Sequence, residues 1–332
     1  MNINKITDIL DKASGKTICI IGDVMLDRYL LGEVTRISPE APVQVFETLK
    51  SEPKLGGAAN VCLNIKKLDA NPYLIGVYGN DREATILKDV LMNTGISDEG
   101  LILDESRPTT SKTRVIADSH HLLRIDSESK KEIDKNIITQ ILNKIENLKN
   151  EFEIIVLQDY NKGVLTKSSI KEILDFAKKN NKKILVDPKF YNFFEYKSVH
   201  IFKPNRKEIE DVYGRKPNTH KELTEMGKEL IKDIGCENLV LTLGNKGMMI
   251  FENKNGQVDV SSINTRARMV SDVSGAGDTV ISTIAVCLAG GAAVKDAVEI
   301  SNYAAGIVVE EVGIVPIEKN TLIEQIKFNY NN

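Results

Sequence analysis

The chain has 332 residues, of which 42% are hydrophobic and 27% are charged, and it carries a formal net charge of −3 with an isoelectric point near 6.0. This composition is ordinary for a globular protein with a sizeable core, and the acidic balance argues against a nucleic-acid partner. The sequence shows neither a signal-peptide core nor an apolar run of membrane-spanning length, so we expect a cytoplasmic protein with no membrane partner.

The N-terminal part of the chain predicts a helix followed by a buried strand. Apolar residues recur at helical spacing over residues 6–10, and the continuous apolar run at 17–21 is typical of a buried parallel strand. Asp23 and Asp27 follow this strand, at the edge where open α/β sheets bind ligands. Both are therefore candidates to accept hydrogen bonds from a polyol, although one of them could instead cap a turn.

Residues 29–51 and 108–126 differ from the rest of the chain. Both segments place a proline-rich or polar turn beside short runs of alternating apolar and polar residues, which predict strands of a small β-sheet lid outside the main sheet. Basic residues gather in and beside these segments: Arg28, Arg36, Lys112, Arg114 and Arg124. A solvated sheet face explains most such charges, and one or two of them could clamp a substrate phosphate. The lid also leaves a strand edge to cover, so we expect a homodimer.

Between the lid segments, a pair of glycines precedes a helix. Gly57 ends the pair, and Asn60 follows in the first turn, where its side chain could bind either a sugar hydroxyl or nearby backbone. A strand at residues 73–78 and a helix at 82–92 come next.

From residue 131, helical and strand patterns alternate regularly. The predicted helices are 132–149, 167–180, 220–234 and a final one from about Val294 to Val309, and the predicted strands are 154–157, 183–186, 238–242 and 248–251. Alternating βα units imply an α/β fold with a central, mostly parallel sheet and helices on both faces. Since no repeat or linker divides the chain, we expect one domain over residues 1–332 with the lid inside it.

The stretch from Val273 to Thr279 carries the strongest chemical pattern. Gly275, Ala276 and Gly277 leave no bulky side chain in the way, so a phosphate could approach the backbone closely. The apolar run that follows predicts a helix, whose free N–H groups and positive dipole end would attract an anion to the turn. Asp278 could reach a hydroxyl held beside that anion, as phosphoryl transfer to an alcohol requires. Alternatively, Asp278 is an ordinary first-turn residue of a helix.

Four motifs, in this order and at these spacings, resemble those of the ribokinase-like, or phosphofructokinase-B, family of carbohydrate kinases. They are Gly56-Gly57-Ala58-Ala59-Asn60, Asn205-x-x-Glu208, Thr242-x-Gly244-x-x-Gly247 and Asp272-x-x-Gly275-Ala276-Gly277-Asp278. The resemblance covers residues 17 to about 315. It departs from many members at Val273-Ser274, where they have Thr-x, but Ser274 keeps a hydroxyl near the turn. The resemblance implies a ribokinase-like fold and phosphoryl transfer from ATP to a sugar.

A narrower resemblance concerns the substrate. Residues 22–29, 36–43, 158–163 and 187–189 look like those of the D-glycero-β-D-manno-heptose 7-phosphate 1-kinases. This resemblance implies phosphorylation of that phosphosugar at its anomeric hydroxyl, giving the 1,7-bisphosphate for ADP-heptose synthesis. Many such kinases are fused to a C-terminal nucleotidyltransferase. Because no HxGH-type motif occurs and no histidine follows His220, we expect a separate nucleotidyltransferase to act downstream. Another sugar or sugar-phosphate kinase of the same fold is the near alternative, and a non-catalytic sensor of sugar and nucleotide is the distant one.

The resemblance also assigns roles to residues. Asp278 would take the proton from the attacking hydroxyl, and Glu208 with Asn205 would hold Mg²⁺ largely through water. The catalytic set is Gly275, Ala276, Gly277 and Asp278, and the ATP-binding set is Lys189, Asn205, Arg206, Lys207, Glu208, Thr242, Gly244 and Gly247. The substrate-binding set is Asp23, Asp27, Gly57, Asn60, Lys112, Arg114 and Lys162. Spacing alone does not choose among Arg28, Lys112, Arg114 and Arg124 for the substrate phosphate.

Overall fold

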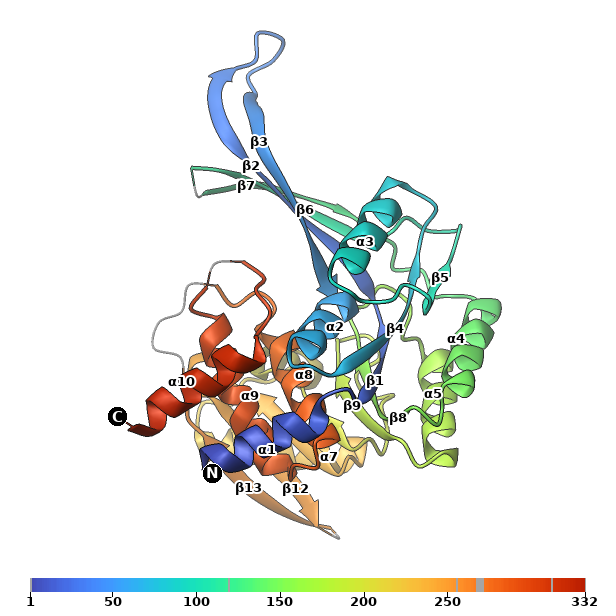
Figure 1. The fold of residues 1–332 in the computed structure, drawn as a ribbon, viewed down its shortest axis with the longest axis vertical. Coiled ribbons are helices and arrows are strands. Elements are labelled where there is room, and N and C mark those ends of the chain that lie inside the picture. Colours follow the sequence, from blue (N-terminus) through green and yellow to red (C-terminus); the bar gives the residue numbers. More distant parts are fainter. Residues whose placement is uncertain (1, 119, 255, 267–271, 312, 332) are drawn as a thin grey trace.

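A central β-sheet covered by helices forms the body of the protein in a computed structural model, and a second, smaller sheet projects from it (Figure 1). The residues that the structure describes are 2–118, 120–254, 256–266, 272–311 and 313–331. No helix within these ranges is long and apolar enough to cross a membrane. Residue 119, inside the predicted lid segment 108–126, lies outside the described residues.

Within the described ranges, the main sheet has nine strands. In order across the sheet they are β13 (Gln257–Ile263), β12 (Met248–Lys254), β11 (Asn238–Thr242), β10 (Ile201–Phe202), β9 (Lys183–Asp187), β8 (Phe152–Gln158), β1 (Thr17–Gly22), β4 (Asn71–Tyr78) and β5 (Leu101–Leu103). All neighbours pair in parallel except β11 with β12 and β12 with β13, which are antiparallel. The predicted α/β fold with a mostly parallel sheet is therefore confirmed.

Two apolar layers sandwich this sheet. In β1, Ile18 and Ile20 contribute to one layer and Cys19 and Ile21 to the other, because successive side chains of a strand point to opposite faces. The first layer is completed by α1 (Ile3–Ala13), α2 (Ala58–Lys67), α3 (Arg82–Asn93), α8 (Ala276–Ala289), α9 (Val294–Val308) and α10 (Lys319–Asn331). The second layer is completed by α4 (Lys135–Asn147), α5 (Lys167–Lys179), α6 (Arg206–Tyr213) and α7 (His220–Ile234).

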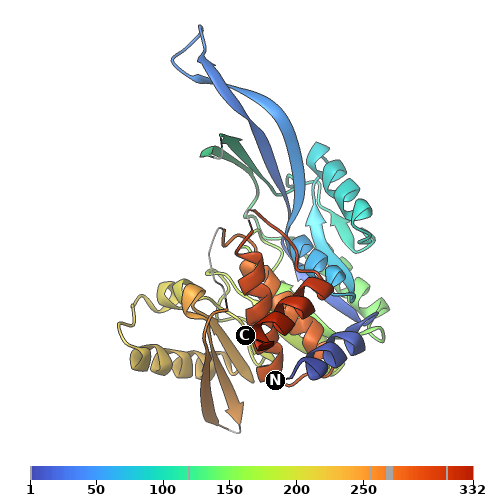
Figure 2. The ribbon, with the colours of Figure 1, turned by 60° about the vertical axis from the view of Figure 1, so that its left-hand side comes forward.

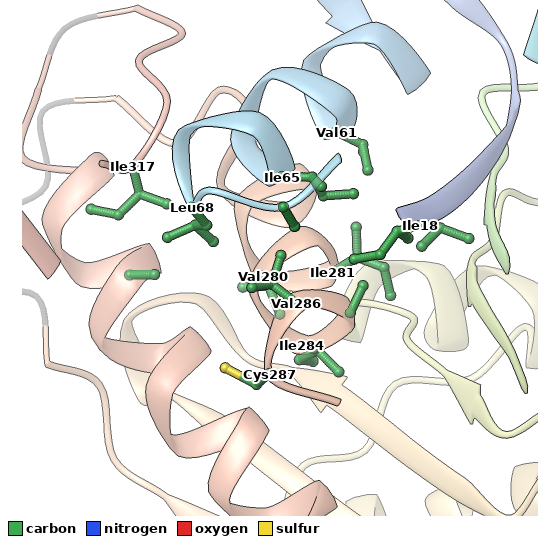
Figure 3. Close-up of a cluster of buried hydrophobic side chains, with 14 of the residues drawn as sticks. Ile18, Val61, Ile65, Leu68, Val280, Ile281, Ile284, Val286, Cys287 and Ile317 are labelled. Carbon is green, nitrogen blue, oxygen red and sulfur yellow. The ribbon is translucent and has the colours of Figure 1, made fainter. Parts of the chain in front are cut away.

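Helix α8 packs between α2 and α9 and is buried around most of its circumference. Figure 3 shows Val280, Ile281 and Ile284 of α8 gathered with Val61 and Ile65 of α2. A helix that is apolar all round belongs to the core, and this packing fixes the position of its N-terminus relative to the sheet.

The smaller sheet has the strand order β3-β2-β6-β7 within the described residues. Its strands are β2 (Val24–Ile37), β3 (Gln44–Gly57), β6 (Ser111–Ala117) and β7 (His120–Ser127). The hairpin of β2 and β3 reaches away from the body beyond the ends of β6 and β7 (Figures 1 and 2). The predicted lid is thus present, but its first two strands are longer than the segment 29–51, because they start and finish in the body of the protein.

Three details of the predicted elements were wrong. The helix predicted from about Val294 to Val309 is not the last one, because α10 follows it and buries Leu322 and Ile326 against the core. Helix α4 is shorter than 132–149, since the Asp134 side chain caps it by accepting the N–H of Ile137 at 2.9 Å. Strands β5 and β13 were also missed, and the first of them has only three residues.

Candidate active site

A cavity of about 630 Å³ lies at the carboxyl edge of the main sheet. Asp187 at the end of β9, Lys203 just after β10 and Thr242 at the end of β11 line it, together with the N-terminus of α8. Because the carboxyl ends of parallel strands share one edge, residues far apart in the sequence meet there. The predicted catalytic turn and most of the predicted ATP-binding residues border this one cavity.

The glycine turn starts α8 and faces the cavity. Gly275 has a φ of +79° and precedes the first helical residue, a conformation that residues with a side chain rarely adopt. At Gly277, a Cβ atom would lie 3.5 Å from Nζ of Lys203 and 3.6 Å from Oδ2 of Asp187. The turn therefore presents backbone, without side chains, to a charged pair on the sheet edge, which leaves room for an anion beside the helix N-terminus.

Asp278 is buried in the first turn of α8, and its carboxylate accepts three hydrogen bonds. Nδ2 of Asn60 donates to Oδ2 at 2.7 Å. Nε2 of Gln158 and the hydroxyl of Tyr160 donate to Oδ1 at 3.0 and 2.8 Å. Asn60 thus contacts the predicted base itself. Gln158 and Tyr160, which the sequence prediction had not assigned to the site, donate the other two hydrogen bonds to Asp278.

The surroundings of Asp278 set its acidity. Burial raises the pKa of Asp278 to about 6, helped by the nearby charge of Asp187, while hydrogen bonds from Asn60 and Tyr160 and the charge of Lys203 act in the opposite direction. A carboxylate with a pKa close to neutrality suits a general base, because it is ionised at working pH yet accepts a proton readily.

Lys203 is a site residue that the sequence prediction missed. Its buried ammonium pairs with Oδ1 of Asp187 at 3.0 Å and faces the backbone at Gly277. The sequence offered a clue, because Lys203 directly follows the apolar residues of a strand and precedes Pro204 and Asn205. A lysine at the end of a buried strand is itself expected to be buried, and buried charged residues usually have a partner or a role. At this point, Lys203 provides a fixed positive charge beside the glycine turn.

Asp23 holds a loop instead of facing the cavity. Its Oδ2 accepts the backbone N–H groups of Tyr160 and Lys162 at 2.7 and 3.0 Å, and its Oδ1 accepts that of Val164 at 3.3 Å. The turn-capping alternative therefore describes its contacts. Asp159, at the start of the same loop, is also buried, and burial together with the charge of Asp23 raises its pKa to about 7.

Asn205 and Glu208 form a reciprocal cap at the start of α6. Oδ1 of Asn205 accepts the N–H of Glu208 at 2.9 Å, and Oε2 of Glu208 accepts the N–H of Asn205 at 2.8 Å. The other carboxylate oxygen of Glu208 pairs with Nζ of Lys189. All three side chains line the cavity, and burial followed by the charge of Asp187 raises the pKa of Glu208.

The remaining predicted ATP-binding residues divide into two groups. Thr242, Gly244 and Gly247 line the cavity, and at Gly247, with a φ of +86°, a Cβ atom would overlap the carbonyl oxygen of Ile263. Arg206 and Lys207 do not line it, because they point along α6 and pair with Glu210 and Asp211. The structure thus brings together most of this set but not those two cations.

The predicted substrate-binding residues where the lid meets the main sheet contact other predicted substrate-binding residues. Asp27 is buried and pairs with Nη1 of Arg114, whose guanidinium lies 5.2 Å from the ring centroid of Tyr29. Gly57, with a φ of +57°, lets its backbone approach the carbonyl of Asp23, where a Cβ atom would overlap the oxygen. The Asp27–Arg114 pair thus joins two strands of the lid, β2 and β6, and the close approach of Gly57 to Asp23 lies where the lid meets the main sheet.

Lys112 and Lys162 converge on one acidic residue. Oε2 of Glu128 lies 3.4 Å from Nζ of Lys112 and 2.7 Å from Nζ of Lys162. Lys112 also lies 3.3 Å from Oδ2 of Asp126, which in turn pairs with Arg124. Two of the cations predicted to hold a substrate phosphate therefore already surround a carboxylate, and Glu128 had not been predicted as part of the site.

Comparison with known families and curated proteins finds relatives over most of the chain. A profile described as "pfkB family carbohydrate kinase" matches residues 16–320. A protein of Desulfatibacillum aliphaticivorans named "Bifunctional protein HldE" is 40% identical over 310 residues, which are 93% of this chain and 63% of that relative. A protein of Geobacter sulfurreducens with the same name is 37% identical over 311 residues, 94% of this chain and 63% of that relative. The chain thus spans less than two-thirds of the length of these relatives.

Solved structures share the fold at lower identity. Ribokinase of Arabidopsis thaliana, solved with ribose and ATP, has a TM-score of 0.74 and 18% identity, covering 95% of this chain and 99% of that one. Phosphofructokinase-2 of Escherichia coli, solved with fructose-6-phosphate, has a TM-score of 0.74 and 14% identity, with coverage of 95% and 99%. At such identities the likeness concerns the fold, and it agrees with the predicted ribokinase-like class.

Proposed function

Because the chain belongs to the pfkB family of carbohydrate kinases, we propose that it transfers the γ-phosphoryl group of ATP to the anomeric hydroxyl of D-glycero-β-D-manno-heptose 7-phosphate. The product is the 1,7-bisphosphate, which would serve ADP-heptose synthesis after a nucleotidyltransferase has acted on it. The relatives named HldE and the heptose-kinase-like stretches of the sequence support this substrate. The use of ATP supports a cytoplasmic location.

The observation that carries the proposal is the buried Asp278 at an open glycine turn, opposite Lys203. The oxygen of the anomeric hydroxyl bonds to the γ-phosphorus of ATP while Asp278 takes the proton of that hydroxyl. The bond between the γ-phosphorus and the β,γ-bridging oxygen breaks, which releases ADP. The backbone N–H groups at the start of α8 and the ammonium of Lys203 stabilise the negative charge on the transferred group. Little covalent chemistry is needed from the protein, so positioning and charge are its main contributions.

The nucleotide binds along the cavity wall formed by Thr242, Gly244 and Gly247, with Lys189 near its phosphates. Asn205 and Glu208 border the same space and would hold Mg²⁺ through its waters, because their own oxygens already bond to Lys189 and to backbone N–H groups and Mg²⁺ keeps several of its waters. When bound, Mg²⁺ neutralises charge on the polyphosphate. Glu208 is fixed for this purpose by its cap to Asn205.

The phosphosugar lies between Asp278 and the lid. Asn60 acts on the sugar site through its hydrogen bond to the base, while Lys112, Lys162 and Arg114 supply cations for the 7-phosphate. In the lid, Ile37, Val43, Leu49, Leu123 and Ile125 expose apolar surface. A second lid from a homodimer would cover such a surface, and light scattering at working concentration tests that assembly.

The test of the function is a panel of phosphosugars and free sugars incubated with ATP and Mg²⁺. ADP release measures turnover, and phosphorus NMR locates the new phosphate. We expect the heptose 7-phosphate to be the best substrate, with the new phosphate at carbon 1. Efficient turnover of ribose or fructose would contradict the substrate but not the kinase, and sugar and ATP binding without any ADP release would indicate a sensor.

A further inference from the structure

The carboxylate of Asp278 has few positions left for a substrate. Each carboxylate oxygen has two lone pairs, so four hydrogen bonds fill the group. Gln158 and Tyr160 both donate to Oδ1, whereas Asn60 donates to Oδ2. Three of the four places are therefore occupied, and the remaining one belongs to Oδ2.

We propose that Tyr160 is a positioning residue, whose hydroxyl acts with the Gln158 amide to hold Oδ1 of Asp278 and leave Oδ2 as the oxygen that accepts the substrate proton. The inference rests on the proposed phosphoryl transfer and adds to it a fixed orientation of the base. Tyr160 lines the cavity, so its hydroxyl reaches Asp278 from the side on which the substrates bind.

Tyr160 is itself held in place from three directions. Its backbone N–H donates to Oδ2 of Asp23 at 2.7 Å. Two residues further on, the carbonyl of Lys162 accepts a hydrogen bond from Nη1 of the buried Arg107 at 2.9 Å. On the other side, Nζ of Lys189 lies 5.5 Å from the centroid of the Tyr160 ring. A phenol fixed in this way can orient a carboxylate without first losing much conformational freedom.

The Gln158 amide is oriented by carboxylates. Its Nε2 donates to Oδ1 of Asp278 and to Oδ2 of Asp187, at 3.0 and 3.1 Å. Its Oε1 is buried and has no hydrogen-bond partner in the part of the chain that the structure describes. Leaving that oxygen without a partner costs free energy, and the opposite orientation would turn it toward two carboxylates. Gln158 therefore has one favourable orientation, with both N–H groups serving the acidic pair.

Several charged and polar groups face Asp278 and together set its acidity. Asp187 on β9 raises the pKa, and Lys203 beside it lowers the pKa, as do the hydrogen bonds from Asn60 and Tyr160. Lys189, whose own pKa Asp278 raises, adds positive charge on the cavity side. Removing the Tyr160 hydroxyl takes away one donor to the charged form, so the pKa of Asp278 should rise above its value of about 6. Since the base must be ionised, activity would then need a higher pH.

Tyr160→Phe tests the inference, with Tyr196→Phe as the matched control. Tyr196 also donates its hydroxyl to a buried carboxylate, Oδ2 of Asp159, at 2.7 Å, but it has no hydrogen bond to Asp278 among the described residues. We expect Tyr160→Phe to move the acidic limb of the kcat profile upward by about one pH unit, which is about a tenfold loss of rate below that limb and a smaller loss above it. Tyr196→Phe should lower the melting temperature and leave the limb in place.

Carbon-13 NMR of aspartate-labelled protein gives a second readout that does not depend on turnover. The Asp278 resonance is the one that disappears in Asp278→Asn, and its titration should shift upward in Tyr160→Phe. An unchanged titration, or an equal shift in Tyr196→Phe, would overturn the inference, because the effect would then be absent or come from the loop. Failure of the wild-type enzyme to phosphorylate any phosphosugar would instead reject the proposed function, while the NMR comparison would still decide the role of Tyr160.

Discussion

The proposed reaction centre and the outer part of the lid differ in how deeply their ion pairs are buried. At the glycine turn, the side chains of Lys203 and Asp187 are 3% and 10% exposed. In the lid, those of Arg124 and Asp126 are 58% and 25% exposed. Burial makes a charged group costly unless fixed partners surround it, whereas exposed pairs form and break at little cost. The charges beside the glycine turn are therefore fixed at the edge of the core, whereas the outer pair of the lid can rearrange, and the pairs of Lys112 and Lys162 with Glu128, at 12–18% exposure, lie between these extremes.

This contrast orders the effects that substitutions should have. Changing a buried group at the reaction centre removes an interaction that nothing nearby can replace. Changing an exposed pair in the lid alters a balance that water and salt already weaken. Effects should therefore decrease from Asp278, through the nucleotide edge and the loop between the regions, to the lid.

Asp278→Asn should have the largest effect. Asparagine keeps the size of the side chain and can still accept from Asn60, so the fold and ATP binding should persist. It cannot take the proton of the attacking hydroxyl, and loss of a positioned base costs about 10²–10⁴ in rate. Single-turnover kinetics, ATP binding and melting temperature should be measured on the same preparation.

The control for this variant is Asp296→Asn, the same change in the first turn of the neighbouring helix α9. It should alter stability by ~1 kcal/mol or less and leave turnover unchanged. If Asp278→Asn resembled this control in turnover, Asp278 would be only a first-turn residue of the helix and not the catalytic base.

Glu208→Gln should come next. Glutamine can keep the cap to the N–H of Asn205, but it removes a negative charge from the cavity wall and leaves Lys189 without its ion-pair partner. We expect about 10–100-fold weaker use of Mg²⁺, with partial recovery at high Mg²⁺, on the scale of changes beside a metal. The measurement is initial rate against Mg²⁺ concentration at fixed ATP.

Glu222→Gln is the matched control for Glu208→Gln. Glu222 also lies in the first turn of a helix, α7, and its Oε2 accepts the backbone N–H of Asn218 at 2.7 Å. Both variants change a helix-start glutamate, but only Glu208 borders the cavity. An unchanged Mg²⁺ dependence in both would reduce Glu208 to a cap.

Asp159→Asn tests the loop that joins the two regions. The pKa of Asp159 is about 7 in the folded protein against an ordinary value of 3.8, mainly because of burial and then because of the charge of Asp23. A raised folded pKa means that its contribution to stability is complete below about pH 4 and is lost as the pH rises through about 7. Asp159→Asn should therefore flatten the dependence of unfolding free energy on pH over this window, by on the order of 4 kcal/mol at ~1.4 kcal/mol for each pKa unit. The measurement is the unfolding free energy from denaturation at several pH values, and plots against pH that run parallel for the wild type and Asp159→Asn would contradict the prediction.

The sequence predicted the parts of the site that are local in the chain. The glycine turn with Asp278 and the motif Asn205-x-x-Glu208 were recognisable because their residues are neighbours in the chain, although the cap that Asn205 and Glu208 form was not predicted. The partner Gln158 was not recognisable as such, since it is 120 positions from Asp278 and meets it only through the strand order of the sheet. The family resemblance placed Arg206 and Lys207 at the nucleotide, but both side chains point away from the cavity, and that of Lys207 is 82% exposed.

The lid was predictable as a sheet but not as a binding surface. Alternating residues indicated its strands, and the paired arrangement of β2 with β6 follows only from the tertiary fold. That pairing brings Arg114 within ion-pair distance of Asp27. Lys112 and Lys162 form ion pairs with Glu128. A count of basic residues could not distinguish a cation bound to a neighbouring carboxylate from one awaiting a phosphate.

Glu128→Gln, in the segment that follows β7, should have the smallest effect and is the sharpest test of the lid. The Glu128 carboxylate lies between Nζ of Lys112 and Nζ of Lys162 and lowers the charge that these two lysines offer to a substrate phosphate. Glutamine removes that competing anion, so KM for the phosphosugar should fall by a factor of about 5, the upper end of the range for exposed ion pairs, because these side chains are only 12–18% exposed. The value of kcat should stay the same, because Asp278 and Lys203 lie outside the lid, and the gain should shrink as salt is added. Glu33→Gln, at an exposed position on the outer part of β2, is the control that changes net charge equally. If both variants lowered KM alike, the lid would act through its overall charge, and if Glu128→Gln raised KM, the carboxylate would be holding the two lysines in place for the phosphate.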